Sequence, residues 1–238
     1  MRDVMRDHGG YCPICEREVT FHIRGAWLRE EYFCTRCWSI PRQRAIIHVI
    51  QKFFQLGSNA IVHESSPAGM ASTKLKQMFP QMTFSHYYPD VQLGELVNGF
   101  RCENLENMTF ADQIFDLFVT QDVFEHVFNP KKAFAEVARV LKLEGIHIFT
   151  VPFYRNQTTK IRATRENDEI EYIFEPEYHQ NPIDQEGGSL VVTEWGTDMA
   201  EVIKSCSGMK TTMYQIKDHS MGIDGEFLEV FVSRKTNA

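Results

Sequence analysis

The pattern of apolar and polar positions predicts an α/β fold from residue 59 onward. Apolar runs that are typical of buried strands ("AIVHE", "MTFSHYY", "FDLFVTQDVF" and "GIHIFTVPF") alternate with segments of helical periodicity. The segment "NPKKAFAEVARVLK" places its apolar residues on one side, as an amphipathic helix does. This alternation predicts a doubly wound, mostly parallel sheet with helices on both faces. "KTTMYQI" and "FLEVFVSRK" then predict a terminal antiparallel hairpin.

Four cysteines near the N-terminus occur in two pairs with metal-ligand spacing. "CPIC" and "CTRC" are separated by 18 residues and contribute Cys12, Cys15, Cys34 and Cys37. Each C-x2-C pair forms a tight turn that directs two thiolates at one point, and two such turns complete the tetrahedron that Zn²⁺ prefers. The intervening residues read as two short strands about Gly25 and predict a zinc ribbon over residues 1–40. The zinc should be structural, because four thiolates leave no open position. A redox C-x-x-C is the rival interpretation, but neither pair has the strand-to-helix setting that it needs.

A connecting helix is expected over residues 41–58. Its apolar positions recur at helical spacing, with Ser39 as a candidate N-cap and Pro41 near the first turn. Arg36, Arg42 and Arg44 lie close together in the sequence, and we interpret them as the solvated start of this helix.

Charge and composition exclude several classes of protein. The 238 residues carry a formal charge of −7, which disfavours a protein that coats nucleic acid or an anionic membrane. No apolar run is long enough to cross a bilayer, and "MRDVMRDHGG" has no apolar segment of a secretory signal. We therefore expect a cytoplasmic protein with no membrane partner.

The most specific run of the α/β region lies between residues 102 and 152. It contains Phe115-Asp116-Leu117, then Glu125-His126-Val127-Phe128-Asn129-Pro130, then Arg139-Val140-Leu141-Lys142-Leu143-Glu144-Gly145. Over residues 59–235 the chain resembles a class I S-adenosylmethionine-dependent methyltransferase, a family that reads there as "F-D-x-[VIL]", "E-H-[VIL]-x-[DN]-P" and "R-V-L-K-P-G-G". The resemblance implies a Rossmann-like fold and S-adenosylmethionine as methyl donor.

The resemblance also implies a set of cofactor-binding residues. Glu64 would be the acid at the end of the first strand, Glu103 and Asn104 would contact adenine, and Gln121 would face the methyl donor. The turn "ESSPAGMAS" departs from the family's "D/E-x-G-x-G-x-G", because Gly69 is its only glycine and Pro67 fixes φ. Small side chains still leave room for the cofactor. The expected cofactor-binding residues are Glu64, Ser65, Ser66, Gly69, His86, Asp90, Glu103, Asn104 and Gln121.

A general base is needed if the methyl acceptor is a hydroxyl. The candidates are His126, His179 and Asp122. His126 could instead stabilise the turn in "EHVFNP", and His179 could be satisfied within its own loop. His179 lies in a polar insertion over residues 153–193, where such enzymes build a substrate lid.

Few features of the sequence identify the methyl acceptor. No "N/D-P-P-Y/F" tetrapeptide of amino-methylating enzymes is present, and the acidic charge weakens RNA or DNA as a substrate. A small-molecule acceptor, such as a sugar or secondary metabolite with a hydroxyl, is expected. The alternatives are an rRNA base methyltransferase and a non-catalytic zinc-ribbon binding protein on a degenerate methyltransferase fold.

Overall fold

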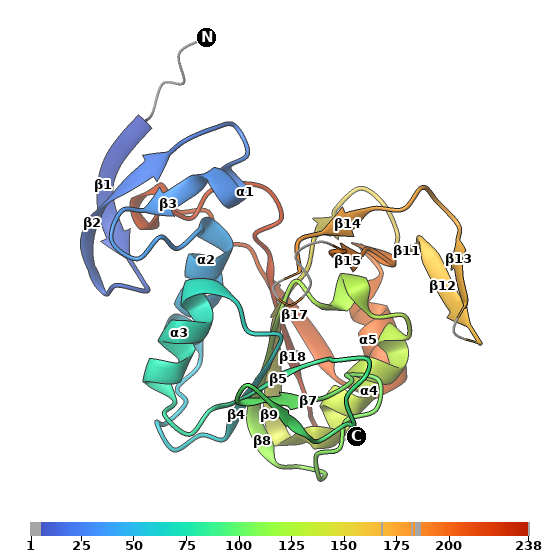
Figure 1. Cartoon of the computed structure of the whole chain (residues 1–238). Coiled ribbons are helices and arrows are strands. Elements are labelled where there is room, and N and C mark those ends of the chain that lie inside the picture. The colour runs from blue at the N-terminus through green and yellow to red at the C-terminus, as the bar shows by residue number, and fades with distance from the viewer. Residues whose placement is uncertain (1–5, 168, 182, 184–186, 238) are drawn as a thin grey trace.

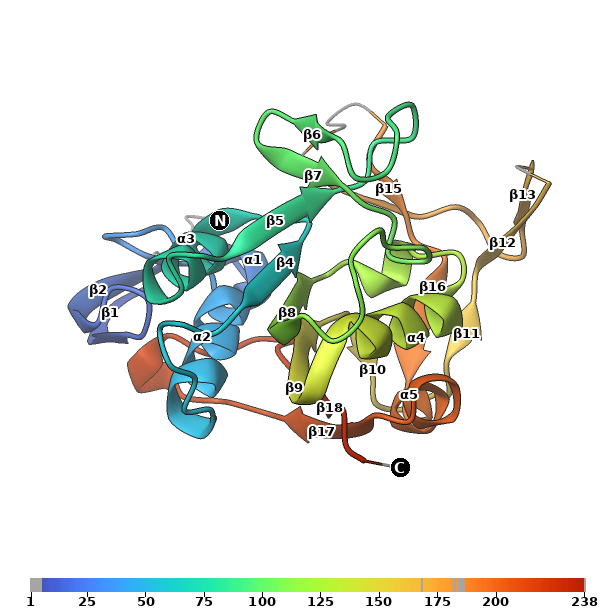
Figure 2. The same ribbon diagram turned by 90° about the horizontal axis from the view of Figure 1, so that it is seen from below.

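The computed structural model describes residues 6–167, 169–181, 183 and 187–237. A twisted sheet lies at the centre of the fold (Figures 1 and 2). Within these residues eight strands are ordered β17-β18-β9-β8-β4-β5-β7-β6. Their bounds are β4 Val62–Ser65, β5 Thr83–His86, β6 Leu96–Val97, β7 Phe100–Cys102, β8 Phe115–Gln121, β9 Leu141–Thr150, β17 Lys210–Tyr214 and β18 Val230–Arg234. The five strands β4, β5, β7, β8 and β9 are mutually parallel, and the two edges are antiparallel. The predicted doubly wound sheet with a terminal hairpin is confirmed.

Helices cover both faces of the sheet. In Figure 1, α2 (Pro41–Phe53) and α3 (Gly69–Met78) lie on one side, and α4 (Pro130–Val140) and α5 (Met199–Ser207) lie on the other. Strand β8 is buried over six of its seven residues, because apolar side chains cover it on both faces. Asn129 caps α4 by accepting a hydrogen bond from the Lys132 amide. Among the described helices, none has the length and apolar character to cross a bilayer.

The N-terminal module is a three-stranded antiparallel sheet of β1 (Arg6–Cys12), β2 (Arg17–Ile23) and β3 (Tyr32–Cys34). The two strands expected about Gly25 are β2 and β3, and the short helix α1 (Leu28–Glu31) lies between them. Phe21 and Tyr32 are buried in the same apolar cluster as Ile46 of α2 and Val62 of β4. The module is therefore packed onto the α/β domain through a continuous core.

Arg44 corrects the interpretation of the helix start as solvated. Its side chain is fully buried, and its guanidinium donates to the carbonyls of Tyr32 (2.9 Å) and Gly222 (3.0 Å from Nε). It also lies 4.9 Å from the ring centroid of Phe21. The N-cap of α2 is Ile40, and Ser39 instead accepts a hydrogen bond from Arg44. Arg44 thus connects the N-terminal module, α2 and the loop that contains the 3₁₀ helix η2 (His219–Met221).

The described residues between 153 and 196 contribute short strands to three small sheets above the domain (Figure 1). Their strands are β10 (Phe153–Tyr154), β11 (Lys160–Ile161), β12 (Ala163–Glu166), β13 (Glu169–Tyr172), β14 (Tyr178–His179) and β15 (Ser189–Leu190), followed by β16 (Thr193–Gly196). The β12–β13 hairpin projects away from the body (Figure 1). The β14–β15 pair is held against the 3₁₀ helix η1 (Phe124–His126), because His126 Nδ1 donates to the Leu190 carbonyl at 2.9 Å.

Candidate active site

A cavity of about 380 Å³ opens at the carboxyl ends of the parallel strands. Ser65 and Ser66 follow from β4, His86 and Tyr87 from β5, and Gln121 from β8. This is the edge of a doubly wound sheet at which ligands bind. The strand order thus brings together residues that are far apart in the sequence.

The turn after β4 presents small side chains to the cavity. Ser65, Ser66 and Ala68 line it, and Ser66 has φ 55°, a left-handed conformation that is uncommon for residues other than glycine. Gly69 (φ 70°) does not line the cavity: a Cβ there would lie 1.9 Å from the Gln43 side-chain nitrogen of α2. The one glycine of the turn therefore allows a close approach of α2, and the serines and the alanine leave space for a ligand.

Glu64 lies behind the cavity wall and is fully buried. Its Oε1 accepts hydrogen bonds from Gln121 Nε2 (2.6 Å) and Ser72 Oγ (2.8 Å), and its Oε2 has no hydrogen-bond partner among the described residues. Burial raises the pKa of this carboxyl to about 7. A buried carboxylate oxygen without a donor suits a cationic group such as the ammonium of S-adenosylmethionine.

The opposite end of the cavity is formed by residues that follow β5 and β7. His86 is 6% exposed and lines the cavity beside Tyr87, whereas Asp90 is exposed and is not a lining residue. Glu103 accepts from the Thr109 amide at 2.8 Å, which fixes its carboxylate at the wall. Of the two residues expected in this segment, His86 therefore lines the cavity and Asp90 does not.

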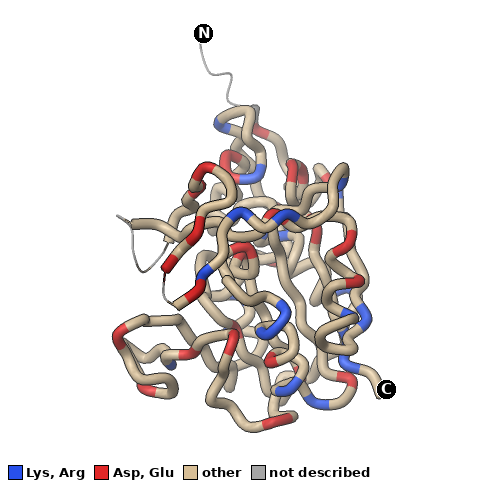
Figure 3. The backbone as a smooth tube through the Cα atoms, turned by 90° about the vertical axis from the view of Figure 1, so that its right-hand side faces the viewer, with Lys and Arg blue, Asp and Glu red and all other residues tan. Residues whose placement is uncertain are grey.

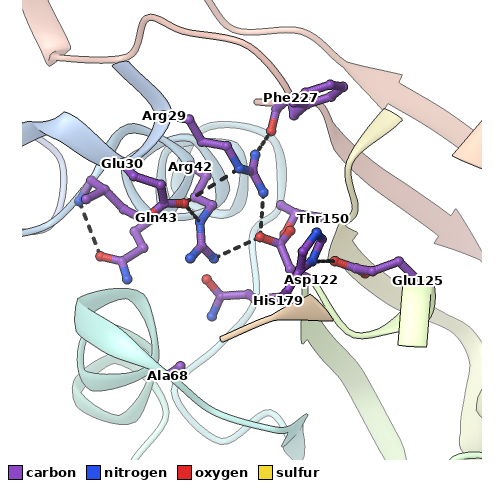
Figure 4. Close-up of polar contacts among 12 residues, drawn as sticks. Arg29, Glu30, Arg42, Gln43, Ala68, Asp122, Glu125, Thr150, His179 and Phe227 are labelled. Atoms are coloured by element: carbon purple, nitrogen blue, oxygen red, sulfur yellow. Dashed lines mark hydrogen bonds and ion pairs between the residues drawn. The ribbon is translucent and has the colours of Figure 1, made fainter. Parts of the chain in front are cut away.

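Asp122 joins the cavity to the N-terminal module. Its carboxylate accepts from Thr150 Oγ1 (2.8 Å) and forms ion pairs with Arg42 of α2 (3.1 Å) and Arg29 of α1 (Figure 4). Burial alone would raise the pKa of Asp122, but the two guanidinium groups outweigh it and hold the pKa well below its usual range. Sequence reasoning missed Arg29 and treated Arg42 as solvated, since nothing in the spacing pairs positions 93 residues apart.

A second polar cluster lies beside Asp122. Glu125 Oε1 is 3.7 Å from His126 Nε2 and 3.8 Å from His179 Nδ1, and the two imidazole rings are perpendicular. His126 Nδ1 lies 2.9 Å from the Leu190 carbonyl, and burial lowers the pKa of His126 to about 4. His126 lines the cavity, and His179 contacts the cluster without being a lining residue.

Most expected cofactor residues converge on this cavity. Those that line it are Ser65, Ser66, His86, Glu103, Asn104 and Gln121. Glu64 contacts Gln121, whereas Gly69 and Asp90 lie elsewhere. Segment 153–193 adds lining residues that the sequence did not single out, namely Arg165, Gln180, Asn181, Ile183, Ser189 and Leu190.

The four cysteines of the N-terminal module also converge. Cys12 Sγ is 3.9 Å from Cys37 Sγ, and Cys15 Sγ is 3.8 Å from Cys34 Sγ. All four sulfurs lie within 4.8 Å of one another. Sulfurs bound to one Zn²⁺ at about 2.3 Å in a tetrahedron are about 3.8 Å apart, so the cluster is compatible with a bound metal ion.

Comparisons with known proteins identify the domain. The family model described as a methyltransferase domain matches residues 64–149. Residues 64–149 therefore form a methyltransferase domain. A comparison with curated proteins finds no match to this sequence.

Solved structures share the fold of this chain at low sequence identity. A chain from the complex between the Haloferax volcanii Trm112 methyltransferase activator and a methyltransferase has a TM-score of 0.54 and 14% identity, over 83% of this chain and 91% of that one. The S-adenosylmethionine-dependent methyltransferase from Mesorhizobium loti has a TM-score of 0.52 and 9% identity, over 80% and 98%. The [4+2]-cyclase SpnF has a TM-score of 0.52 and 12% identity, over 97% and 87%.

Proposed function

We propose that this methyltransferase transfers the methyl group of S-adenosylmethionine to a hydroxyl of a small molecule, such as a sugar or a secondary metabolite. The observation that supports this proposal is the cavity itself. Its volume of about 380 Å³ falls in the range of small-molecule sites, and described residues of segment 153–193 line part of it. Residues 153–193 are therefore proposed as the substrate lid.

The cavity residues suggest how the cofactor would lie. Glu64 and Gln121 would receive the amino-acid end, where the free Oε2 of Glu64 suits an ammonium. His86 and Tyr87 would contact the ribose, and Glu103 with Asn104 would contact the adenine. The sulfonium would lie against the turn at Ser65 and Ser66 without a steric clash, because the side chains of this turn are small.

The acceptor hydroxyl would lie beside His126. The acceptor would lose its hydroxyl proton to a base. The acceptor oxygen would then take the methyl group that S-adenosylmethionine supplies, which leaves S-adenosylhomocysteine. His126, which lines the cavity, or His179 beside it would receive that proton. Asp122 is a weaker base, because its two arginine partners stabilise the ionised carboxylate. We assign Asp122 to positioning the end of β8.

The cysteine cluster would bind Zn²⁺ in a structural role. Burial and the neighbouring sulfurs raise the pKa of Cys15 to about 12, so a cation would be needed to hold this ligand as a thiolate. Thiolate ligands also fit a reducing compartment, which is consistent with a cytoplasmic location.

Nucleic acid remains a weaker substrate class. The net charge is −7, and acidic and basic positions are interspersed on the face shown in Figure 3. A net negative charge gives no overall electrostatic attraction to RNA.

Calorimetry with three nucleosides tests the cofactor site. S-adenosylmethionine and S-adenosylhomocysteine should bind with micromolar Kd, and Glu64→Gln should weaken both about 10-fold or more, because a charge-assisted contact to the ammonium is lost. 5′-Methylthioadenosine lacks the amino-acid end, so Glu64→Gln should leave its affinity unchanged. Asp90→Asn is the matched control and should bind all three as the wild type does.

Absence of binding at millimolar nucleoside would contradict the proposal and favour the degenerate scaffold. Because a [4+2]-cyclase shares this fold, binding is followed by a search for methylated products among hydroxylated small molecules. Methylation of RNA but of no small molecule would overturn the proposed acceptor class.

A further inference from the structure

Two histidines and a glutamate converge at the wall of the cavity. Glu125 and His126 come from η1, directly after β8, and His179 comes from β14 in segment 153–193. The nitrogen atoms of His126 and His179 that face Glu125 lie 3.7 Å and 3.8 Å from its Oε1. Figure 4 shows the His179 side chain directed at Glu125. This set of side chains lies apart from the four cysteines.

No described residue donates a hydrogen bond to the carboxylate of Glu125. Its side chain is 1% exposed, and neither carboxylate oxygen has a hydrogen-bond partner among the described residues. Burying an ionised carboxylate in this way is costly unless a cation or a proton compensates the charge. Oε1 lies within 4 Å of a nitrogen atom of each of two imidazoles, and imidazole is a common metal ligand.

Each histidine is oriented by a contact through its other nitrogen. His126 Nδ1 lies 2.9 Å from the Leu190 carbonyl and donates to it, which leaves the Nε2 lone pair facing Glu125. His179 Nε2 is 3.5 Å from Glu177 Oε1, and its Nδ1 faces Glu125. A histidine that binds a metal through one nitrogen characteristically donates through the other to a carbonyl or a carboxylate.

The surrounding charges favour a cation. Ion pairs link this cluster to a network in which five carboxylates meet three guanidinium groups among the described residues. The acids are Glu30, Asp122, Glu125, Glu177 and Glu194, and the bases are Arg29, Arg42 and Arg162. When all five carboxylates are ionised they exceed the three guanidinium groups by two charges, which a divalent ion would balance.

We propose that Glu125, His126 and His179 form a binding site for a divalent first-row transition-metal ion that is open to the cavity. Ligand atoms of a four-coordinate ion with bonds of about 2.1 Å lie about 3.4 Å apart, and the two distances from Glu125 Oε1 to the histidine nitrogens, 3.7 Å and 3.8 Å, exceed this by only a few tenths of an ångström. Two imidazoles and one carboxylate leave coordination positions free, as sites that act on a substrate do. His126 lines the cavity, so oxygen atoms of a bound molecule would reach those positions.

A role for the ion in methyl transfer rests on the proposed function. With the ion bound, the histidine lone pairs are used for coordination, so metal binding and a histidine base are alternatives for handling the acceptor hydroxyl. The metal site itself is tested without the cofactor and without an acceptor, so its failure and the failure of the proposed function are distinguishable.

Cobalt titration of the zinc-loaded chain tests the site. Calorimetry should show one further equivalent of Co²⁺, with the weak visible absorption of nitrogen and oxygen ligands and without the intense near-ultraviolet band of cobalt thiolates. Zinc content should stay constant, which shows that Co²⁺ has not displaced the ion at the cysteines. Glu125→Gln and His179→Gln should each weaken this binding at least 100-fold, and Glu177→Gln should weaken it about 10- to 100-fold, because it only orients His179.

His22→Gln is the matched control, since His22 pairs with Asp7 on the N-terminal module and should leave Co²⁺ binding unchanged. Urea unfolding of each variant verifies that the fold is retained. The proposal is overturned if the wild-type chain with its zinc in place takes up no Co²⁺. It is equally overturned if Glu125→Gln binds Co²⁺ as tightly as the wild type, because Glu125 would then be a protonated, purely structural group.

Discussion

The two clusters of metal-ligand residues differ in how the chain assembles them. The four cysteines come from two short turns, residues 12–15 and 34–37, and three short strands bring these turns together. Glu125 and His126 lie in η1, whereas His179 arrives from a separate strand pair above the domain. The first cluster is set by local spacing and the second by tertiary structure.

The clusters also differ in what surrounds them. The cysteine cluster is complete with four sulfurs and belongs to the apolar core shared with α2. The Glu125–His126–His179 cluster has three ligands, borders a cavity and is surrounded by ion pairs. A closed cluster in a core is expected to contribute to folding, and an open cluster at a cavity is expected to act on a ligand. The comparison therefore assigns stability to one region and chemistry to the other.

The largest predicted effect is the loss of the closed cluster. Cys34→Ser should abolish metal binding at the cysteines and lower the free energy of unfolding by about 5 kcal/mol or more, because the metal provides folding energy to a module that shares its core with the domain. Elemental analysis and urea denaturation measure the two changes. Cys206→Ser is the control, since this thiol lies outside the cluster, and it should cost about 1 kcal/mol or less. Full metal retention in Cys34→Ser would contradict four-thiolate ligation and remove the contrast between the regions.

The second effect tests the connection between the two regions. Asp122→Asn should destabilise the chain by about 3–5 kcal/mol, because Arg29 is 5% exposed and would lose its carboxylate partner. Equilibrium unfolding in urea measures this loss. Glu30→Gln should cost about 1 kcal/mol or less, because Glu30 is an exposed partner of Arg29.

A compensating variant sharpens that experiment. Adding Arg29→Met to Asp122→Asn should restore part of the stability, since no buried charge is then left unpaired at this position. Equal stability of Asp122→Asn and the wild type would mean that the two regions are energetically independent at this contact.

Sequence reasoning succeeded where a local pattern encodes the structure. The cysteine spacing identified all four clustered thiols, and the apolar runs identified the parallel strands and the terminal hairpin. The strand ends also identified Ser65, His86 and Gln121 as cavity residues, because parallel strands end at a common edge.

Sequence reasoning failed where a contact depends on packing between distant elements. Arg29 reaches Asp122 from α1, and Gly69 faces α2 rather than the cavity, although its turn is at the site. Arg44 is buried because carbonyls of β3 and of a C-terminal loop surround it. In each case the partner lies in another element. The spacing of residues within one segment therefore does not predict the contact.

The smallest predicted effect concerns two buried carboxylates of the cavity region that differ in their partners. Glu64 Oε1 accepts two hydrogen bonds, whereas neither oxygen of Glu125 accepts any. Because these two hydrogen bonds hold Glu64 in place, we follow the titration of Glu64. Burial raises the pKa of Glu64 in the folded chain from 4.5 to about 7, so the folded state binds this proton more tightly than the unfolded state does. The stabilisation by this proton is present below about pH 4.5 and is lost as the pH rises through 7.

Glu64→Gln removes this titration. Relative to the variant, the wild type should lose on the order of 3 kcal/mol of unfolding free energy between pH 4.5 and pH 7. Burial lowers the pKa of His63 and of His147 to about 3, which acts in the opposite direction, but both proteins share these groups and the difference cancels them. Urea denaturation from pH 5 to pH 8 measures the difference. Parallel pH profiles would show that Glu64 is compensated in the free protein, and the cofactor's ammonium would then no longer be needed to explain its free oxygen.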